Sequence, residues 1–549
     1  MKKFTIYLLF CLPLSLSTSC MDEFLDQPAQ GQMTEDDFLE NSSSVSSLTN
    51  SIYTTYREGS AWETIGSWIG DLCSDNALRG SSLSDGGGTI FNNGVNQFQN
   101  MSGLNGSSDF LNWLWNNAYT GIGRANTALK AIREFDGIDP HQKEILEGEA
   151  RFNRAWFYFS VLKHWGKGPI VPLETLTGAE MADIAIANRT TLYDSIMADL
   201  EAGLLMPDKE EASQWYPTSW YGRAHWGSAM GLMAKVLLYR AADEPERANE
   251  YYTRIVSIVK EMELSDDSYG LEPLSILFSK SGEYGSESVF EIGAASFMTS
   301  DGAYQGWQVV GVRSDPNWGW GFVAPSLNLV QSYEPGDNRK ENDIIYGRTT
   351  AFSGMEQTPS VIDGTTIVGS YIADDPASAS NGFPNRFTRK GYQPRPVTGG
   401  NENYGGNIRL MRWAEVLLIG AEAAVQCGDA KASEWYNAVR ARAGLGEKEA
   451  TLENIWEEKR IELSMERDRY FDLVRIDKIR PGYFAARVWA KIQSEQAGLE
   501  LMKELGIATE STFLPLPTTS PVETPKNYVL PIPNEQILLM NNLEQNPYY

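Results

Sequence analysis

The chain has only three histidines but many acidic residues that could bind a metal or take part in acid–base catalysis. His141, His164 and His225 lie far apart, without the HExxH or HxH spacing that places two histidines on one zinc ion. No phosphate-binding, dinucleotide-binding or GxSxG motif is present, and we expect Gly86–Gly88 to lie in a polar loop without a helix start. We therefore expect the histidines to be structural and the protein not to be an enzyme.

Carboxylates offer the alternative route to catalysis, because a glycosidase needs only two of them across a cleft. The chain has 72 acidic residues, and one segment alternates acids with cations at helical spacing. That segment contains Glu457, Glu458, Lys459, Arg460, Glu462, Glu466 and Arg467. Such a pattern is typical of a solvated helix face whose charges pair with one another, so we expect no catalysis from it. A surface glycoside hydrolase is the alternative.

Calcium is the metal for which the acids offer ligands. Asp374 and Asp375 are adjacent, and Asp337 precedes them in the same loop-rich region. No EF-hand spacing accompanies them. We therefore expect no cofactor, with calcium as the alternative.

The amino-terminal residues carry the features of export and anchoring. A basic start (MKK) precedes an apolar run, Phe4–Leu16, that is too short to span a bilayer. Small residues then lead into Cys20, and the stretch LSTSC is similar to a bacterial lipobox. We predict a signal peptide over 1–19, acylation of Cys20 and a lipid-anchored linker over 20–35. An ordinary secretory signal is the alternative.

The net charge argues against a nucleic-acid partner. The formal charge is −26 at pH 7, and removal of residues 1–19 takes away two lysines and no acid, which leaves about −28 by the same count. Such a surface repels phosphate backbones. Cys73 and Cys427 are the other cysteines of the mature chain, and their spacing leaves open whether they pair.

Helical periodicity dominates two regions, about 36–265 and 408–505, which must provide the frame for any site. Apolar residues from Leu410 to Val425 fall on one helical face, and Gly428 and Gly444 stand where helices should end. The region about 270–405 is rich in Gly, Ser, Asp, Asn and Pro and predicts a loop-rich insertion with few short strands. Prolines in the tail 510–549 predict an extended segment that lies over the helices.

Sequence similarity between two segments of the chain indicates repeated helix pairs. ANEYYTRIV, which starts at Ala248, resembles ASEWYNAVR, which starts at Ala432. In each, a tyrosine (Tyr252 or Tyr436) follows the alanine by four residues, so the small and the aromatic residue share one face. Such units resemble tetratricopeptide repeats, and we predict a mainly α, tetratricopeptide-like scaffold.

Longer stretches resemble one family in order along nearly the whole mature chain. They are GEARFNRAWFYFSVLKHWGKGPIV (148–171), GRAHWGSAMGLMAKVLLYRA (222–241), YEPGDNRK (333–340), NIRLMRWAEVLLIGAEAAVQCGD (407–429), EEKRIELSMERDRYFDLVR (457–475) and VLPIPNEQI with LEQNPYY at the carboxyl terminus. Together they are similar to SusD/RagB proteins. The resemblance implies a single SusD-like domain over 36–549, anchored in the outer membrane and facing the cell exterior. It also implies that the protein captures a nutrient, usually a glycan, and delivers it to a SusC-like TonB-dependent transporter. Asp22, Glu23 and Asp26 look like the signal that sends such lipoproteins to the outer face.

Two loop-rich stretches carry side chains suited to a sugar. An exposed indole packs against the C–H face of a sugar ring, and Asn, Asp and Arg bind its hydroxyls. The family draws ligand aromatics from a region near the first helices and from another midway along the chain. The candidates here are Trp68, Asp75, Asn76, Arg79, Tyr304, Trp307, Arg313, Trp318 and Trp320. A peptide ligand, as in the RagB-like branch, is the alternative, and Trp318 and Trp320 alternatively only pin their loop.

Overall fold

The computed structural model describes residues 42–57, 66, 68–80, 89–209, 222–267, 269–293, 321–346, 386–390, 406–504 and 516–549, with the backbone of four short strands between 351 and 366. Helices predominate, as predicted. The longer ones are α3 (Ser42–Thr54), α4 (Thr89–Asn100), α5 (Asp109–Glu134), α6 (Pro140–Trp165), α8 (Arg189–Gly203), α10 (Trp226–Asp243), α11 (Ala248–Glu263), α17 (Trp413–Cys427), α18 (Lys431–Arg442), α19 (Leu452–Glu462), α20 (Arg469–Ile479) and α21 (Tyr483–Glu504).

The shorter helical segments connect these rods or follow them. They are the π-helix η2 (Trp68–Leu72), α7 (Gly178–Ala182), η3 (Pro245–Arg247), α12 (Leu274–Leu277), η4 (Lys280–Gly282), α14 (Leu327–Ser332), α15 (Arg339–Asp343), η6 (Lys526–Tyr528) and α22 (Asn534–Leu539).

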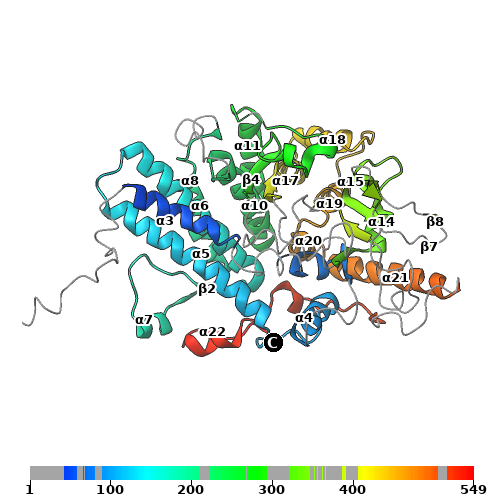
Figure 1. The fold of residues 1–549 in the computed structure, drawn as a ribbon, viewed down its shortest axis with the longest axis horizontal. Helices are drawn as coiled ribbons and strands as arrows, with labels where there is room; N and C mark the ends of the chain where they lie inside the picture. The colour runs from blue at the N-terminus through cyan, green and yellow to red at the C-terminus, as the bar shows by residue number, and fades with distance from the viewer. Residues whose placement is uncertain are drawn as a thin grey trace, which may run out of the picture.

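The long helices pack as successive neighbours (Figure 1). Helices α3, α5, α6 and α8 lie together at one end, α10 and α11 follow, and α17 and α18 continue the series toward α19. Helix α21 lies at the opposite end. Buried side chains from nearly all of these elements form one contiguous apolar core, as stacked helix pairs require.

Local sequence explains where the helices begin and end. The Asp139 side chain accepts hydrogen bonds from the amides of His141 (3.0 Å) and Gln142 (3.2 Å), and Pro140 occupies the first turn of α6. Gly166 ends the same helix at φ +73°. Gly428 at φ +76° and Gly444 at φ +81° end α17 and α18, which confirms both predicted ends.

The predicted repeat units lie next to each other although about 150 residues separate them in sequence. The pair α10–α11 packs on the pair α17–α18 through α11 and α17. A Cβ on Gly420 would lie 2.9 Å from the Trp435 ring and 3.0 Å from Val259, so a larger residue would force these side chains to shift at this junction of three helices. Tyr252 and Tyr436, the tyrosines of the two similar segments, are both buried.

Strands are short and occur in separate antiparallel pairs in the described part of the chain. They are β1 (Ala77–Gly80) with β5 (Phe322–Pro325), β2 (Gly168–Pro169) with β3 (Ile186–Ala187), β4 (Ser288–Ile292) with β12 (Ile408–Arg412), β6 (Ile344–Tyr346) with β11 (Arg386–Thr388), β7 (Ala351–Phe352) with β8 (Met355–Glu356), and β9 (Val361–Ile362) with β10 (Thr365–Thr366). The prediction that Leu410 belongs to the helix ending at Cys427 is wrong. Leu410 lies in β12, because residues 408–412 pair with β4 and the helix begins only at Trp413.

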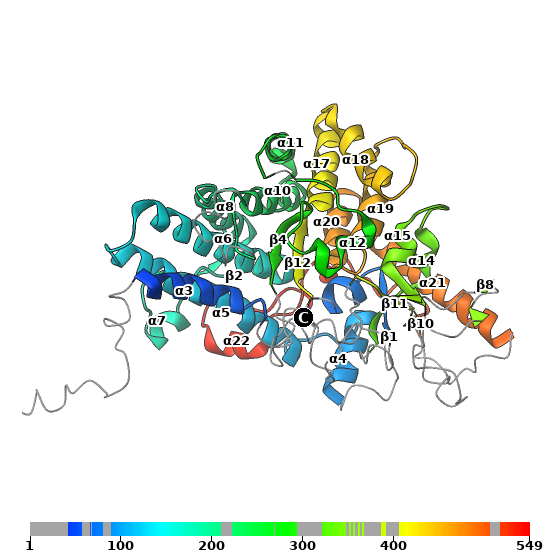
Figure 2. The same cartoon turned by 45° about the horizontal axis from the view of Figure 1, so that its top comes forward.

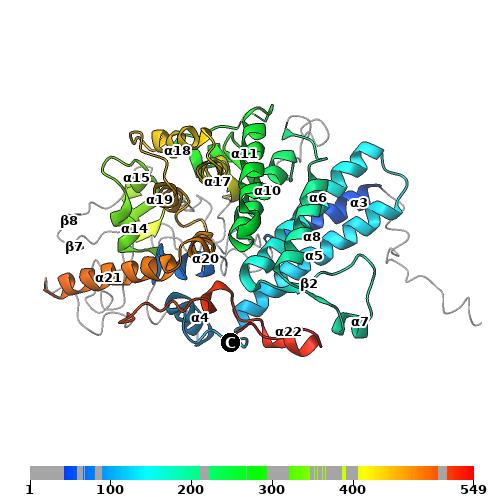
Figure 3. The ribbon, with the colours of Figure 1, turned by 180° about the vertical axis from the view of Figure 1, so that it is seen from behind.

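The described carboxyl-terminal tail lies across the ends of α5 and α6 (Figure 3). The Leu530 amide donates to the His164 carbonyl oxygen (2.7 Å), and the Trp165 indole N–H donates to that of Pro531 (3.2 Å). The Asn534 amide donates to the Gly106 carbonyl oxygen (2.7 Å), just before α5 begins. These contacts fix the tail on the helical frame.

Candidate functional site

The two stretches that the sequence proposes for ligand binding meet in space. Strand β1, which follows Asp75 and Asn76, pairs with β5, which follows Trp318 and Trp320. Gly80 lies opposite Phe322, so the chain leaves the first stretch beside the point where it returns from the second. We call this pair of strands, residues 77–80 and 322–325, the loop junction. It lies near β11 and α21 (Figure 2).

The junction requires glycine at its close contact. Gly80 has φ +66°, and a Cβ there would lie 2.3 Å from the carbonyl oxygen of Gly321, itself at φ +72°. The Arg79 guanidinium lies 5.5 Å from the centre of the Phe322 ring, a cation–π contact between the two strands. The bases of the two stretches are therefore held against each other.

Most of the predicted aromatic residues lie outside what the structure describes. These are Tyr304, Trp307, Trp318 and Trp320, together with the side chain of Trp68, whose backbone begins η2. Arg313 also lies outside the described residues. Their proposed contacts with a ligand stay predictions. The described structure shows that the two segments that carry these residues meet at the loop junction, where β1 pairs with β5.

The other three predicted residues require a correction, because Asp75, Asn76 and Arg79 are buried. Asp75 is fully buried among three arginines, with Nε of Arg469 at 2.8 Å and Nε of Arg460 and of Arg487 both at 3.0 Å. Burial by itself raises the pKa of Asp75, but the three guanidinium groups outweigh it and hold that pKa well below its usual range. Asp75 thus stabilises the base of the loop instead of facing a ligand.

Asn76 and Arg460 extend the same anchor to the second stretch. Arg460 Nε donates to the Asn76 side-chain oxygen (3.1 Å), while its Nη2 donates to the Asp75 carbonyl oxygen (2.9 Å) and to Asn328 of α14 (2.8 Å). The Ser326 hydroxyl donates to the Asp75 carbonyl oxygen (2.8 Å), and its amide donates to that of Asn76 (2.7 Å). Residues on both sides of the junction therefore share one set of hydrogen bonds.

Helix α21 contacts β1 directly and also contacts the chain just after β5. The Lys491 ammonium donates to the carbonyl oxygens of Leu72 and Ala77, both at 3.2 Å. One turn further, Glu495 accepts hydrogen bonds from the Leu327 amide and from the Arg386 guanidinium (3.1 Å). Both stretches are thus fixed to the same helix.

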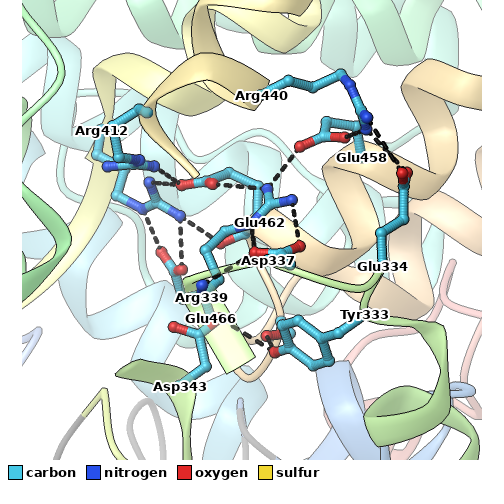
Figure 4. A network of polar contacts seen from close by, with 12 residues as sticks. Tyr333, Glu334, Asp337, Arg339, Asp343, Arg412, Arg440, Glu458, Glu462 and Glu466 are labelled. Atoms are coloured by element: carbon cyan, nitrogen blue, oxygen red, sulfur yellow. Dashed lines mark hydrogen bonds and ion pairs between the residues drawn. The ribbon is translucent and has the colours of Figure 1, made fainter. Parts of the chain in front are cut away.

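An ionic cluster, largely buried apart from the exposed Glu334, joins the middle of the chain to α18, α19 and β12 (Figure 4). Its members are Glu287, Glu334, Asp337, Arg339, Asp343, Lys390, Arg412, Arg440, Arg442, Glu458, Glu462 and Glu466. Arg339 contacts Asp337 at 2.8 Å and Glu458 at 2.6 Å, and Arg412 contacts Glu287 at 2.7 Å.

The cluster corrects the prediction of a solvated acidic face. Glu458, Lys459, Arg460 and Glu462 are buried, and they pair with Arg440, Asp472, Asp75 and Arg442 from elsewhere in the chain instead of with one another as predicted. Burial raises the pKa of Glu462, but the neighbouring cations Arg442, Arg412 and Arg339 outweigh it and hold the pKa well below its usual range. Asp337, a possible calcium ligand in the sequence, is occupied by Arg339. The sequence pattern indicated neither this burial nor these partners, because the partners lie outside the segment.

Comparison with known families agrees with this architecture. Residues 286–549 match the model of the SusD family, and residues 23–238 match a model described as starch-binding associating with outer membrane. Together the two matches cover most of the chain. The chain belongs to the SusD family.

Individual relatives are distant in sequence and similar in fold. SusD-like protein P2 of Formosa agariphila is 23% identical over the full length of both chains. A laminarin-binding SusD-like protein of known structure is 23% identical, with a TM-score of 0.69 over 93% of this chain and all of that one. Surface glycan-binding protein A of Bacteroides thetaiotaomicron, solved in complex with laminarihexaose, is 20% identical, with a TM-score of 0.67 over 92% of this chain and all of that one. Identities this low show the shared fold.

The remaining candidate residues of this SusD family member take separate places. His164 and His225 are buried in different helical regions, and His141 lies at the start of α6. No three His, Cys, Asp or Glu side chains are grouped to hold a metal ion within the described ranges. Cys73 and Cys427 are both free. Among the helices that the structure describes, none has the length and apolar character needed to cross a bilayer.

Proposed function

We propose that this protein is a cell-surface lipoprotein that captures a glycan and delivers it, unaltered, to a SusC-like TonB-dependent transporter in the outer membrane. The observation that carries the proposal is the loop junction, where β1–β5 pairing brings together the bases of two tryptophan-bearing stretches on a rigid helical frame. Such loops are where ligand contacts concentrate in other folds. Relatives named for laminarin and surface-glycan binding support a sugar as the ligand.

The proposal includes the absence of catalysis. The acids of the 457–466 segment that stood as candidate catalysts are held by cations inside the protein, apart from the partly exposed Glu457. The relatives are named as binding proteins, which supports capture without cleavage. Membrane association through acylated Cys20 fits the name of the amino-terminal family model.

Affinity electrophoresis in gels containing laminarin and other soluble glycans tests the proposal. We expect retardation of the wild-type protein, with Trp68→Ala and Trp320→Ala each weakening binding about tenfold, because a central aromatic contact contributes more than 1 kcal/mol. Trp113→Ala is the matched control, since this indole is 43% exposed on α5 and lies outside both stretches.

Two further measurements separate the alternatives. New reducing ends after incubation with a retarding glycan would show hydrolysis and overturn the proposal. Binding of a peptide library without retardation by any glycan would replace the sugar by a peptide. Melting temperatures of the three tryptophan variants should stay close to that of the wild type, because the proposal assigns Trp68 and Trp320 to a ligand surface and Trp113 is 43% exposed.

A further inference from the structure

A recess apart from the loop junction lies between α6, α10, β12 and the turn that joins α19 to α20. This pocket opens to solvent, and its described lining contains none of the nine predicted ligand residues. Asp468, Glu466 and Lys163 lie on its rim with side chains that are 22%, 15% and 11% exposed. The recess is therefore reachable from outside.

Positive charge predominates on the walls of this pocket. Four cationic side chains line it, Lys163, Lys235, Arg409 and Arg467, against the two carboxylates of Glu466 and Asp468. Lys163 contacts Asp468 at 3.0 Å, and Lys235 contacts both Asp468 and Glu415. The four lining cations outnumber the two lining acids, while Glu415 and Glu291, which contact Lys235 and Arg409, lie behind the lining. The excess of cations in the lining favours an anionic ligand.

Cations behind the lining neutralise one of its two acids. Glu466 accepts from Arg412 at 2.8 Å and from Lys390 at 2.7 Å, and neither of these cations lines the pocket. Arg409 makes long polar contacts with the Ser279 carbonyl oxygen at 3.3 Å and Glu291 at 3.9 Å, and its guanidinium lies 5.4 Å from the centre of the Phe278 ring. Its guanidinium can therefore bind an added anion with little rearrangement.

His164 supplies an open hydrogen-bond acceptor in the lining. Its Nδ1 lies 2.7 Å from the Ser160 carbonyl oxygen and must donate to it, so the proton of the neutral ring is on Nδ1. Its Nε2 is then an acceptor, and no described group donates to it although the residue is only 4% exposed. Burial lowers the pKa of His164 to about 3, so the ring stays neutral at physiological pH.

The same wall combines aromatic rings with strained backbone. Trp156, Phe159 and Phe471 line the apolar part. In the turn, Met465 at φ +64° and Arg467 at φ +76° both hold the left-handed conformation that side chains disfavour. Such strain concentrates at ligand sites.

We propose that this pocket binds one anionic sugar unit, carrying a carboxylate or a sulfate ester, of the captured glycan. The acid group contacts Arg409 and Lys163, a ring hydroxyl donates to His164 Nε2, and the C–H face packs on the aromatic wall. The identity of the ligand as part of a glycan rests on the proposed function. Binding of a free anionic monosaccharide does not depend on the loop stretches.

Isothermal titration of the purified mature protein with D-glucuronate, D-glucose 6-sulfate, D-glucose, acetate and inorganic sulfate tests the proposal. We expect one of the two anionic sugars to bind at least about tenfold more tightly than glucose, acetate and sulfate. Equal binding of glucose would show that the pocket does not recognise the charge. Equal binding of acetate or sulfate would show that it does not recognise the sugar ring. Either result would overturn the proposal.

Variants link the binding to this pocket. Arg409→Gln and Lys163→Gln should each weaken the anionic sugar about tenfold, and Leu410→Trp should fill the recess and abolish binding. Lys260→Gln is the control, because Lys260 lies on α11 and forms a surface ion pair with Asp429. Unchanged affinity in folded Arg409→Gln and Leu410→Trp would place the ligand elsewhere. Retardation by laminarin should persist in all four variants, so failure here is distinguishable from failure of the proposed function.

Discussion

Asp71 and Asp75 lie four residues apart and are both buried, yet their surroundings move their pKa values in opposite directions. Burial raises the pKa of Asp71 from 3.8 to about 7, and Arg467 offsets this only in part. At Asp75 three arginines outweigh the burial and hold the pKa low. Between pH 4 and 7, folded Asp71 therefore keeps a proton that the unfolded chain releases, so its contribution to stability falls as pH rises.

Asn substitutions at these two positions should have opposite effects. Asp71→Asn removes a carboxyl whose ionisation opposes folding, so its free energy of unfolding should rise relative to the wild type by about 2–3 kcal/mol between pH 5 and pH 8. Asp75→Asn leaves the buried guanidinium groups of Arg460 and Arg469, and the partly exposed one of Arg487, without their shared carboxylate and should cost about 3–5 kcal/mol throughout that range. Urea unfolding of the three proteins at several pH values measures both. A pH-independent difference for Asp71→Asn would show that its carboxyl is ionised in the fold.

At the scale of elements, the contact between η2 and the turn after α19 fixes the geometry beneath the loop junction. A Cβ on Gly70 would lie 1.8 Å from the Arg467 carbonyl oxygen, a contact that only movement of backbone could relieve. Gly70→Ala should therefore lower stability by about 3 kcal/mol and weaken glycan retardation, because η2 leads directly into β1. Gly123→Ala on α5 is the control, since nothing lies within 4 Å of its Cβ and alanine favours a helix by up to about 1 kcal/mol. Thermal unfolding compares the two, and equal melting temperatures would mean that η2 can shift freely.

Elements with local causes were predictable from sequence, and elements with distant partners were not. Gly428 and Gly444 end helices as expected, because a left-handed cap depends on a few neighbouring residues. Leu410 follows the helical period of the next segment, but its strand forms only because residues 288–292 lie beside it. Asp75 was predicted to face a ligand, since nothing near it in sequence shows that Arg469, 394 residues later, binds it. Regional placement of the site was more predictable than individual side chains, because chain segments meet through strand pairing.

At the scale of the whole molecule, the start of the described chain and the loop junction lie in different regions. Helix α3 is packed with α5 and α6 at one end, while α21, which holds the junction, lies at the other (Figure 1). The described chain therefore begins away from the junction, and the proposed anchor at Cys20 precedes that beginning in sequence. Capture by the loops and anchoring at the amino terminus should be separable functions.

Cys20→Ala tests that separation directly. Cys20 lies outside the described residues, and its acylation is the expected source of membrane attachment. The variant should move from the membrane fraction to the soluble fraction of producing cells, while its retardation by glycan and its melting temperature match those of the wild type, because no described core residue lies before Val45. Cys11→Ala changes the same residue type inside the predicted signal peptide and should leave the protein in the membrane fraction. Membrane retention of Cys20→Ala would mean that another segment holds the protein at the membrane, and loss of glycan binding would mean that the anchor takes part in capture.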